Sequence, residues 1–182
     1  LMGLSYHFNR HYSKAGEWFK KGVALKTDKI YPPTWHFLGW TALYLGELEE
    51  SKKAFNHFLL LEPNKADPLF SLGLIPFQEG DFSEAKVKFT RSIQETEDFE
   101  VQAKATARLA DVNAELGNWK KSIVLYEEAL TLNPDLYEAW YRLSRVLRRM
   151  GQENESNDAL HAFERARRRV RPDLHTQTRF PE

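Results

Sequence analysis

Cysteine is absent from the 182 residues of this sequence, and methionine occurs only twice. A chain without cysteine has no disulfide, no thiol nucleophile and no cysteine-ligated metal. The sequence also lacks any run of about 18 apolar residues, the length that a membrane-spanning helix needs. Lys and Arg balance Asp and Glu at 26 each, so no net charge directs the chain to nucleic acid or to a membrane.

Motifs of catalysis are missing as well. The sequence contains no phosphate-cradling glycine loop, no H-E-x-x-H zinc pattern and no G-x-S-x-G nucleophile turn. Its carboxylates are spread along the chain, as solvated helix faces require. We therefore expect no catalytic residue, no cofactor and no metal site, and we interpret the chain as a non-enzymatic protein.

What the sequence does have is a period. Glycines recur 34 residues apart, in the pairs Gly39 and Gly73, Gly46 and Gly80, and Gly117 and Gly151. The same interval separates Phe55 from Phe89 and Leu109 from Leu143. A period of this length, with paired helical patterns inside it, is typical of a solenoid rather than of one globular core.

Four successive units share one residue pattern. Their first halves read Trp35-x-x-Leu38-Gly39, Leu69-x-x-Leu72-Gly73, Leu109-Ala110 and Trp140-x-x-Leu143-Ser144, and their second halves include Ser51-x-x-x-Phe55, Ala85-x-x-x-Phe89, Ser122-x-x-x-Tyr126 and Ser156-x-x-x-Leu160. This pattern resembles the tetratricopeptide repeat family, whose signature is W-x2-L-G-x2-Y, then A-x3-F, then P. The resemblance implies an all-α fold, an α-solenoid of tandem antiparallel helix pairs that form a right-handed superhelix.

The pattern predicts one array of about five repeats over residues 1–182. The repeats cover residues 1–31 (truncated at the N-terminus), 32–65, 66–102, 103–136 and 137–171, and residues 172–182 form an extended tail. Because Met2-Gly3-x-x-Tyr6 begins inside a repeat, we expect a longer natural protein. First helices should end near Gly46, Gly80, Gly117 and Gly151, where a left-handed residue satisfies free carbonyls. Three surplus residues near Asp98 fit a longer helix or a longer loop equally well.

In this family the first helices line a concave groove, so the resemblance also implies a binding surface. The positions carried over to this sequence are His36, Trp40, Tyr44, Phe70, Leu74, Phe77, Arg108, Asp111, Tyr141, Arg145 and Arg149. Trp40, Phe70, Leu74 and Phe77 are the expected apolar anchors, and Arg108, Arg145 and Arg149 should orient acidic groups. Some family members grip a chaperone's C-terminal carboxylate, but the two Asn ligands are lacking here, and that ligand is not predicted.

The predicted function is a protein–protein interaction scaffold that binds a partner peptide or protein in its concave groove. One alternative is a docking or regulatory segment of a larger enzyme or assembly. A weaker alternative is nucleic-acid contact through the C-terminal end, because 11 of the 13 arginines follow residue 100. We expect a protein or peptide partner, no nucleic acid and no membrane span. Self-association through the C-terminal tail or the open N-terminal repeat remains a further option.

Overall fold

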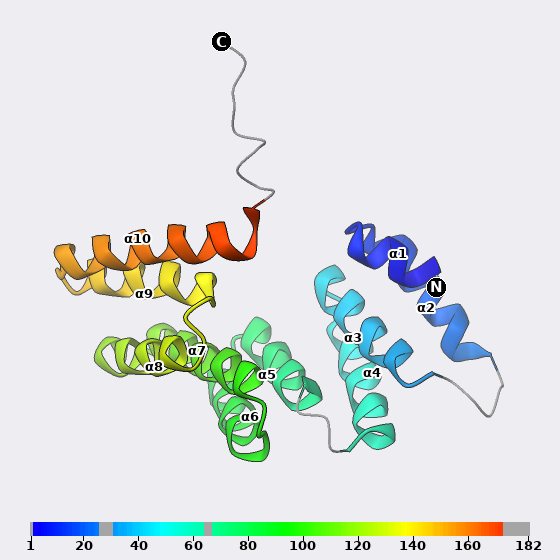
Figure 1. Ribbon diagram of the computed structural model, residues 1–182. Coiled ribbons are helices and arrows are strands. Elements are labelled where there is room, and N and C mark those ends of the chain that lie inside the picture. The colour runs from blue at the N-terminus through cyan, green and yellow to red at the C-terminus, as the bar shows by residue number, and fades with distance from the viewer. Residues whose placement is uncertain (1, 26–30, 64–66, 173–182) are drawn as a thin grey trace, which may run out of the picture. The chain divides into compact units, whose positions relative to one another are not determined.

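A computed structural model describes residues 2–25, 31–63 and 67–172. Over these residues the chain forms ten helices and no strand. The helices are α1 (Met2–Phe8), α2 (Tyr12–Ala24), α3 (Pro33–Leu45), α4 (Leu48–Leu61), α5 (Asp67–Glu79), α6 (Phe82–Glu95), α7 (Phe99–Glu115), α8 (Trp119–Leu132), α9 (Tyr137–Arg149) and α10 (Glu153–Val170) (Figure 1). The chain divides into two compact units, residues 1–88 and residues 89–182, and the boundary falls within α6.

Helices that follow one another in the chain pack as pairs within each unit. In unit 1, α1 packs on α2 and α3 on α4; in unit 2, α7 packs on α8 and α9 on α10. Because the connecting turns are short, the paired helices run antiparallel (Figure 1). The second helix of one pair also packs on the first helix of the next, as α2 does on α3 and α8 on α9. The predicted all-α fold of tandem helix pairs is confirmed; the repeat boundaries and the single array stay predictions.

Both units use the same turn between the helices of a pair. Gly46, Gly80, Gly117 and Gly151 all have positive φ, between 75° and 80°. After Gly46 the next amide, that of Glu47, donates to the carbonyl of Ala42 at 2.9 Å. This left-handed turn provides hydrogen bonds to the last free carbonyls of the first helix. Glycine adopts the left-handed conformation easily because it has no Cβ that would clash with the backbone. The predicted helix ends are therefore confirmed.

Glycine has a second role where the two helices of a pair cross. A Cβ built on Gly39 would lie 2.6 Å from the ring of Phe55, and one on Gly3 would lie 2.7 Å from Phe19. The absence of a side chain thus lets the aromatic ring of the second helix reach the backbone of the first. Ser51 adds a hydrogen bond between the same two helices, because its hydroxyl donates to the carbonyl of Gly39 at 2.9 Å.

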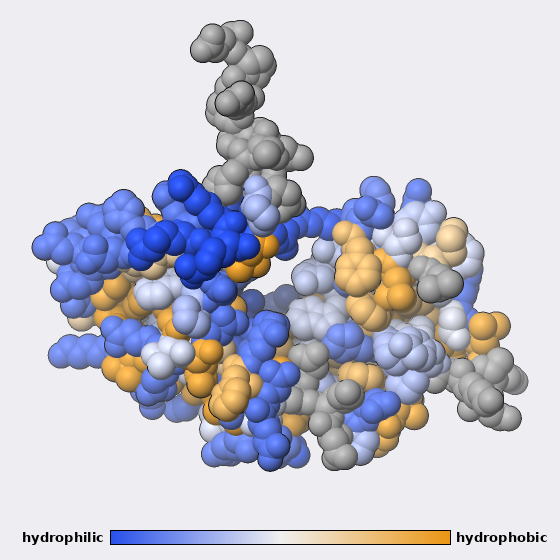
Figure 2. Space-filling model, viewed as in Figure 1, coloured by the Kyte–Doolittle hydropathy of each residue, from blue (hydrophilic) through white to orange (hydrophobic). Residues whose placement is uncertain are grey.

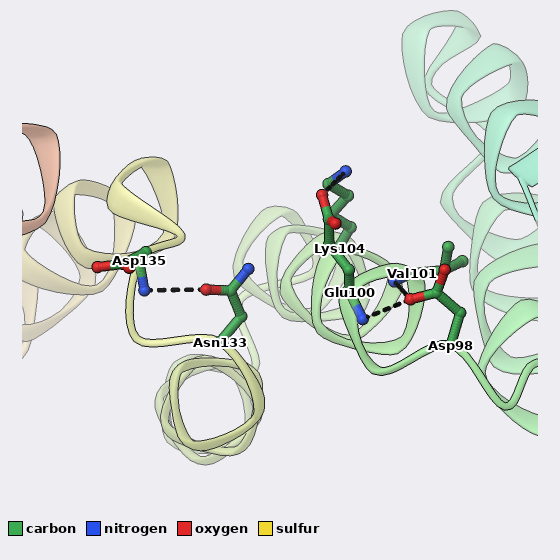
Figure 3. Close-up of polar contacts among 6 residues, drawn as sticks. All are labelled: Asp98, Glu100, Val101, Lys104, Asn133 and Asp135. Carbon is green, nitrogen blue, oxygen red and sulfur yellow. Dashed lines mark hydrogen bonds and ion pairs between the residues drawn. The ribbon is translucent and has the colours of Figure 1, made fainter. Parts of the chain in front are cut away.

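The three surplus residues at the end of the third repeat lengthen the first helix of the fourth repeat, α7. α7 has 17 residues, whereas α3, α5 and α9 have 13 each. Asp98 caps it, since its carboxylate accepts from the amides of Glu100 at 2.8 Å and Val101 at 3.4 Å (Figure 3). The structure therefore favours the longer helix over the longer loop. The tail predicted over residues 172–182 lies outside the described residues from residue 173 onward.

Candidate functional site

The first helix of the second repeat, α3, carries Trp40 and Tyr44 on one side. Trp40 is half-buried, and its ring centroid lies 5.9 Å from Tyr44, 5.8 Å from Phe55 and 6.5 Å from Phe70. Tyr44 is 54% exposed, although it belongs to a helix whose other apolar side chains are largely covered. The side chain of Trp40 is thus partly packed inside unit 1 and partly exposed at its surface, whereas the side chain of Tyr44 is mainly exposed.

The remaining predicted positions of unit 1 are more deeply placed. Phe70 and Leu74 of α5 are buried, and Phe77 is half-buried, with its ring 5.7 Å from that of Phe82. His36 is half-buried and lies 5.1 Å from the ring of Phe58. The apolar anchors expected from the sequence are therefore not one exposed patch: α5 contributes buried packing, and the exposed area lies on α3.

Two side chains that the sequence reasoning missed extend this exposed area. Tyr12 stacks on Tyr44 with ring centroids 4.6 Å apart, and Phe8 at the end of α1 is 71% exposed. We call Phe8, Tyr12, Trp40 and Tyr44 the aromatic surface. A signal for Phe8 was present, since the interval of 36 residues from Gly3 to Gly39 also joins Phe8 to Tyr44.

His7 lies beneath the aromatic surface. Its ring is 5.6 Å from Tyr12, 5.5 Å from Phe37 and 6.1 Å from Tyr44, and its Nδ1 shares a hydrogen bond of 2.8 Å with the hydroxyl of Thr41. Burial lowers the pKa of His7, and the nearby His36 lowers it further. A neutral imidazole therefore joins α1 to α3 at neutral pH.

Unit 1 also contains an apolar pocket that the sequence did not indicate. Its volume is about 600 Å³. It lies between α1, α2 and the start of α3, with Trp18, Phe19 and Phe37 among its walls and Lys21 at its edge. The ammonium of Lys21 is 5.2 Å from the ring centroid of Trp18. Neither the eleven predicted groove residues nor the four residues of the aromatic surface line this pocket, although its wall residue Phe37 lies 5.8 Å from the ring of Phe8.

In unit 2, two of the five predicted positions, Arg108 and Asp111, belong to an ionic cluster. Asp111 is 8% exposed, and its Oδ2 accepts from Arg108 at 3.0 Å and from Arg142 at 3.1 Å. The phenolic hydroxyl of Tyr126 donates to the other carboxylate oxygen of Asp111. These four residues, which we call the Asp111 cluster, come from α7, α8 and α9 and so link three helices. Arg142 and Tyr126 had not been predicted as members of the site.

Burial and charge set the proton affinities in the Asp111 cluster. Burial lowers the pKa of Arg108, and the charge of Arg142 lowers it further, against the opposing effect of Asp111. Burial raises the pKa of the Tyr126 hydroxyl, and the adjacent carboxylate raises it further. At neutral pH the Tyr126 hydroxyl therefore keeps its proton and donates a hydrogen bond to the Asp111 carboxylate.

Three further predicted residues lie on α9 outside the cluster. Tyr141 is 46% exposed, and its ring is 5.6 Å from that of Phe163 on α10. Arg145 is exposed, one helical turn from Arg142. Arg149 lies over the ring of Trp119, with its guanidinium carbon 4.4 Å from the ring centroid, so part of its binding capacity is already used within unit 2. Figure 2 shows hydrophilic residues dominating the surface over α10, whereas hydrophobic residues reach the surface around α1.

Neither unit offers a site for metal chemistry or a membrane span in its described part. Among these residues, no three His, Asp or Glu side chains gather as metal ligands would. None of the described helices is long and apolar enough to cross a bilayer.

Two segments of the chain match models of one repeat family. Residues 32–65 and residues 103–146 each match a model described as tetratricopeptide repeat. No curated protein sequence matches the chain.

Solved structures with the same fold cover most of the chain. A crystal structure of MamA matches with a TM-score of 0.67 and 20% identity, over 93% of this chain and 96% of that one. PilF of Pseudomonas aeruginosa matches with a TM-score of 0.74 and 16% identity, over 90% and 72%. The Rap conjugation gene regulator of plasmid pLS20, solved in complex with the Phr* peptide, matches with a TM-score of 0.78 and 17% identity, over 93% and 52%. At these identities the similarity shows a shared helical-repeat fold.

Proposed function

Because the chain is a tetratricopeptide repeat protein, we propose that it is a non-enzymatic interaction scaffold whose first helices bind a peptide or protein partner. The observation that carries this proposal is the aromatic surface of unit 1. Phe8 is 71% exposed and Tyr44 is 54% exposed. Neither residue occupies a packing position of the repeat, so the packing of the repeat does not explain why aromatic residues stand there. Large aromatic side chains at the surface are the usual anchors of protein interfaces.

The chemistry of the aromatic surface suits a peptide. Tyr12, Trp40 and Tyr44 form a continuous row of rings, with centroid distances of 4.6 Å and 5.9 Å between neighbours. Rigid rings bury much apolar area at low entropic cost, and their polar edges can hydrogen-bond to a peptide backbone. The solved Rap regulator, a chain of the same fold, is in complex with a peptide, which supports this mode of binding.

The arginines of unit 2 would serve a different purpose. Arg145 is exposed, and charged groups at an interface act mainly on association rate and orientation. In this proposal each unit has its own binding chemistry: the aromatic surface of unit 1 offers apolar anchors, and the arginines of unit 2 attract acidic groups. Arg149 has a smaller role than its position in the sequence suggested, because it lies over Trp119.

Selection of peptides from a displayed random library against the purified chain would test the proposal. The selected peptides should be measured by calorimetry against the wild type and against Tyr44→Ala. Loss of a central aromatic anchor typically weakens binding by about 2 kcal/mol or more, which corresponds to roughly 30-fold in Kd. Circular dichroism should show that the helical content of Tyr44→Ala is unchanged, since this side chain is largely exposed.

Lys121→Ala is the matched control, because Lys121 is exposed on the second helix α8. It should leave peptide affinity within the error of the measurement. Equal weakening by Lys121→Ala and Tyr44→Ala would mean that second-helix surfaces bind the partner, and the proposal would then be wrong.

A further inference from the structure

The Asp111 cluster contains an imbalance of charge. One carboxylate, that of Asp111, receives two guanidinium groups, those of Arg108 and Arg142, at 3.0 Å and 3.1 Å. The Tyr126 hydroxyl adds a hydrogen bond but no charge. The cluster therefore carries a net charge of about +1 at neutral pH, in surroundings where only 29% and 30% of the two arginine side chains are exposed.

A second cation is not required for the internal ion pair. A single arginine would neutralise Asp111, and a second, partly buried guanidinium loses hydration without a full counter-charge. Within residues 2–25, 31–63 and 67–172, no carboxylate other than Asp111 pairs with Arg108 or Arg142. The two guanidiniums also repel each other, and each still has N–H donors that Asp111 does not use.

We propose that Arg108 and Arg142 form an oxyanion subsite of unit 2 that takes a carboxylate or a phosphate group of a peptide bound at that unit. This rests on the proposed function for the identity of the ligand, and it names the partner as an acidic or phosphorylated segment. The planar guanidinium fork matches both oxyanions, and partial burial strengthens the attraction. Arg145, exposed one turn further along α9, adds positive potential at the edge of the subsite.

Asp111 has a definite role in this proposal. Its carboxylate occupies one side of both guanidiniums, orients them and lowers their net charge from about +2 to about +1. It therefore competes electrostatically with an incoming anion while it holds the subsite in shape. Removing its charge should tighten anion binding, whereas a purely structural ion cluster predicts no gain.

Side-chain NMR of the whole chain, with inorganic phosphate as the probe, would test the subsite without a partner peptide. Phosphate is titrated against chloride at constant ionic strength, and the arginine Nε–H signals are followed. Saturable shifts are expected at Arg108 and Arg142 and not at Arg165, which is exposed on α10. Uniform, non-saturating shifts at all arginines would overturn the proposal.

Three variants separate the subsite from general charge effects. Asp111→Asn should tighten phosphate binding by about fivefold or more, because one negative charge is removed from close range. Arg142→Gln should abolish the saturable shift at Arg108, and the matched control Arg165→Gln should leave it unchanged. Asp111→Asn that folds and binds phosphate no better than wild type would contradict the proposal. If Asp111→Asn fails to fold, the comparison of Arg142→Gln with Arg165→Gln decides.

Peptide measurements then identify the source of the oxyanion. Three versions of one selected peptide, carrying Glu, phosphoserine or Ala at a single position, are compared on wild type and Arg142→Gln. If Arg142→Gln weakens the affinity of only the Glu peptide or only the phosphoserine peptide, the oxyanion is a carboxylate or a phosphate respectively. Equal affinity of all three peptides for both proteins would contradict the subsite. Failure of the scaffold proposal is recognised differently, by an unchanged affinity of Tyr44→Ala for every peptide.

Discussion

Units 1 and 2 have the same framework but opposite chemistry at corresponding positions. A shift of 105 residues aligns α3 with α9, and it joins Gly46 to Gly151 and Leu38 to Leu143. The same shift joins Phe37 to Arg142, Trp40 to Arg145 and Tyr44 to Arg149. Leu38 and Gly46 keep their residue type under this shift, whereas positions beside them change from aromatic to cationic.

Details of the framework support this division. Ser51 donates to the carbonyl of Gly39 at 2.9 Å, and Ser156 donates to the carbonyl of Ser144, also at 2.9 Å. The aligned turn glycines, Gly46 in unit 1 and Gly151 in unit 2, have φ values of 75° and 77°. Packing and turns thus constrain one set of positions in every repeat. The remaining first-helix positions are free to vary, and they are where we expect the binding specificity of the chain to lie.

The largest effect is expected at a framework position. Phe55→Ala removes a fully buried ring that packs on Gly39, and it should lower the free energy of unfolding by about 3–5 kcal/mol. Urea unfolding followed by circular dichroism measures this. The control Lys52→Ala, at an exposed position of α4, should change stability by less than about 0.5 kcal/mol. Comparable unfolding midpoints for the two variants would break the division between framework and variable positions.

The next effect concerns the ionic side of the comparison. Tyr126→Phe removes the hydroxyl that donates to buried Asp111, and a hydrogen bond to a charged group contributes about 1.5–3 kcal/mol. The matched control is Tyr141→Phe, since Tyr141 is largely exposed. Urea unfolding should show a clear loss for the first variant and almost none for the second. Equal stability of both would show that Tyr126 does not support the Asp111 cluster.

A smaller effect depends on pH and belongs to unit 1. The folded pKa of His7 lies below its ordinary value of 6.5, so the unfolded chain binds a proton first as pH falls. Stability should therefore be complete above pH 6.5 and should decrease as pH falls from 6.5 towards the folded pKa. Urea midpoints between neutral and acidic pH measure this slope.

The variant His7→Gln should reduce that pH dependence, whatever its effect on stability at neutral pH. Ser13→Gln, at an exposed position of α2, serves as the control and should retain the wild-type slope. A His7→Gln protein with an undiminished slope would show that other groups produce the pH dependence.

The smallest effect is expected for an exposed ion pair. Lys20 and Glu47 lie 2.8 Å apart in unit 1, but both side chains are more than 40% exposed. Water and salt screen such pairs, so Lys20→Gln should cost less than about 1 kcal/mol. Tyr126→Phe in unit 2 removes a donor to the buried carboxylate of Asp111, and its cost should be larger. A larger loss for Lys20→Gln would reverse the contrast between exposed and buried charges.

Much of the architecture could be predicted from the residues alone, for a local reason. Gly46 and Gly151 mark helix ends because the left-handed turn depends on the backbone of a few neighbouring residues. Gly39 and Phe55 mark a helix crossing because every repeat solves the same packing problem. Local rules of this kind repeat at a fixed interval, and so they can be read from the spacing. They did not decide whether the surplus near Asp98 was helix or loop, since both fit the same number of residues.

The candidate site was only partly accessible in this way. The sequence placed Trp40, Tyr44 and Asp111 on first helices, but it did not show that Arg149 lies over Trp119 or that Arg142 reaches Asp111 from another helix. Such partners are 30 or more residues apart, and side-chain length and helix crossing decide whether they meet. Repeat spacing by itself determined the helix pairs, their turns and which residues lie on first helices. Tertiary structure alone decided which of those side chains are buried, paired or available for binding, because burial and charge pairing depend on neighbours from other helices.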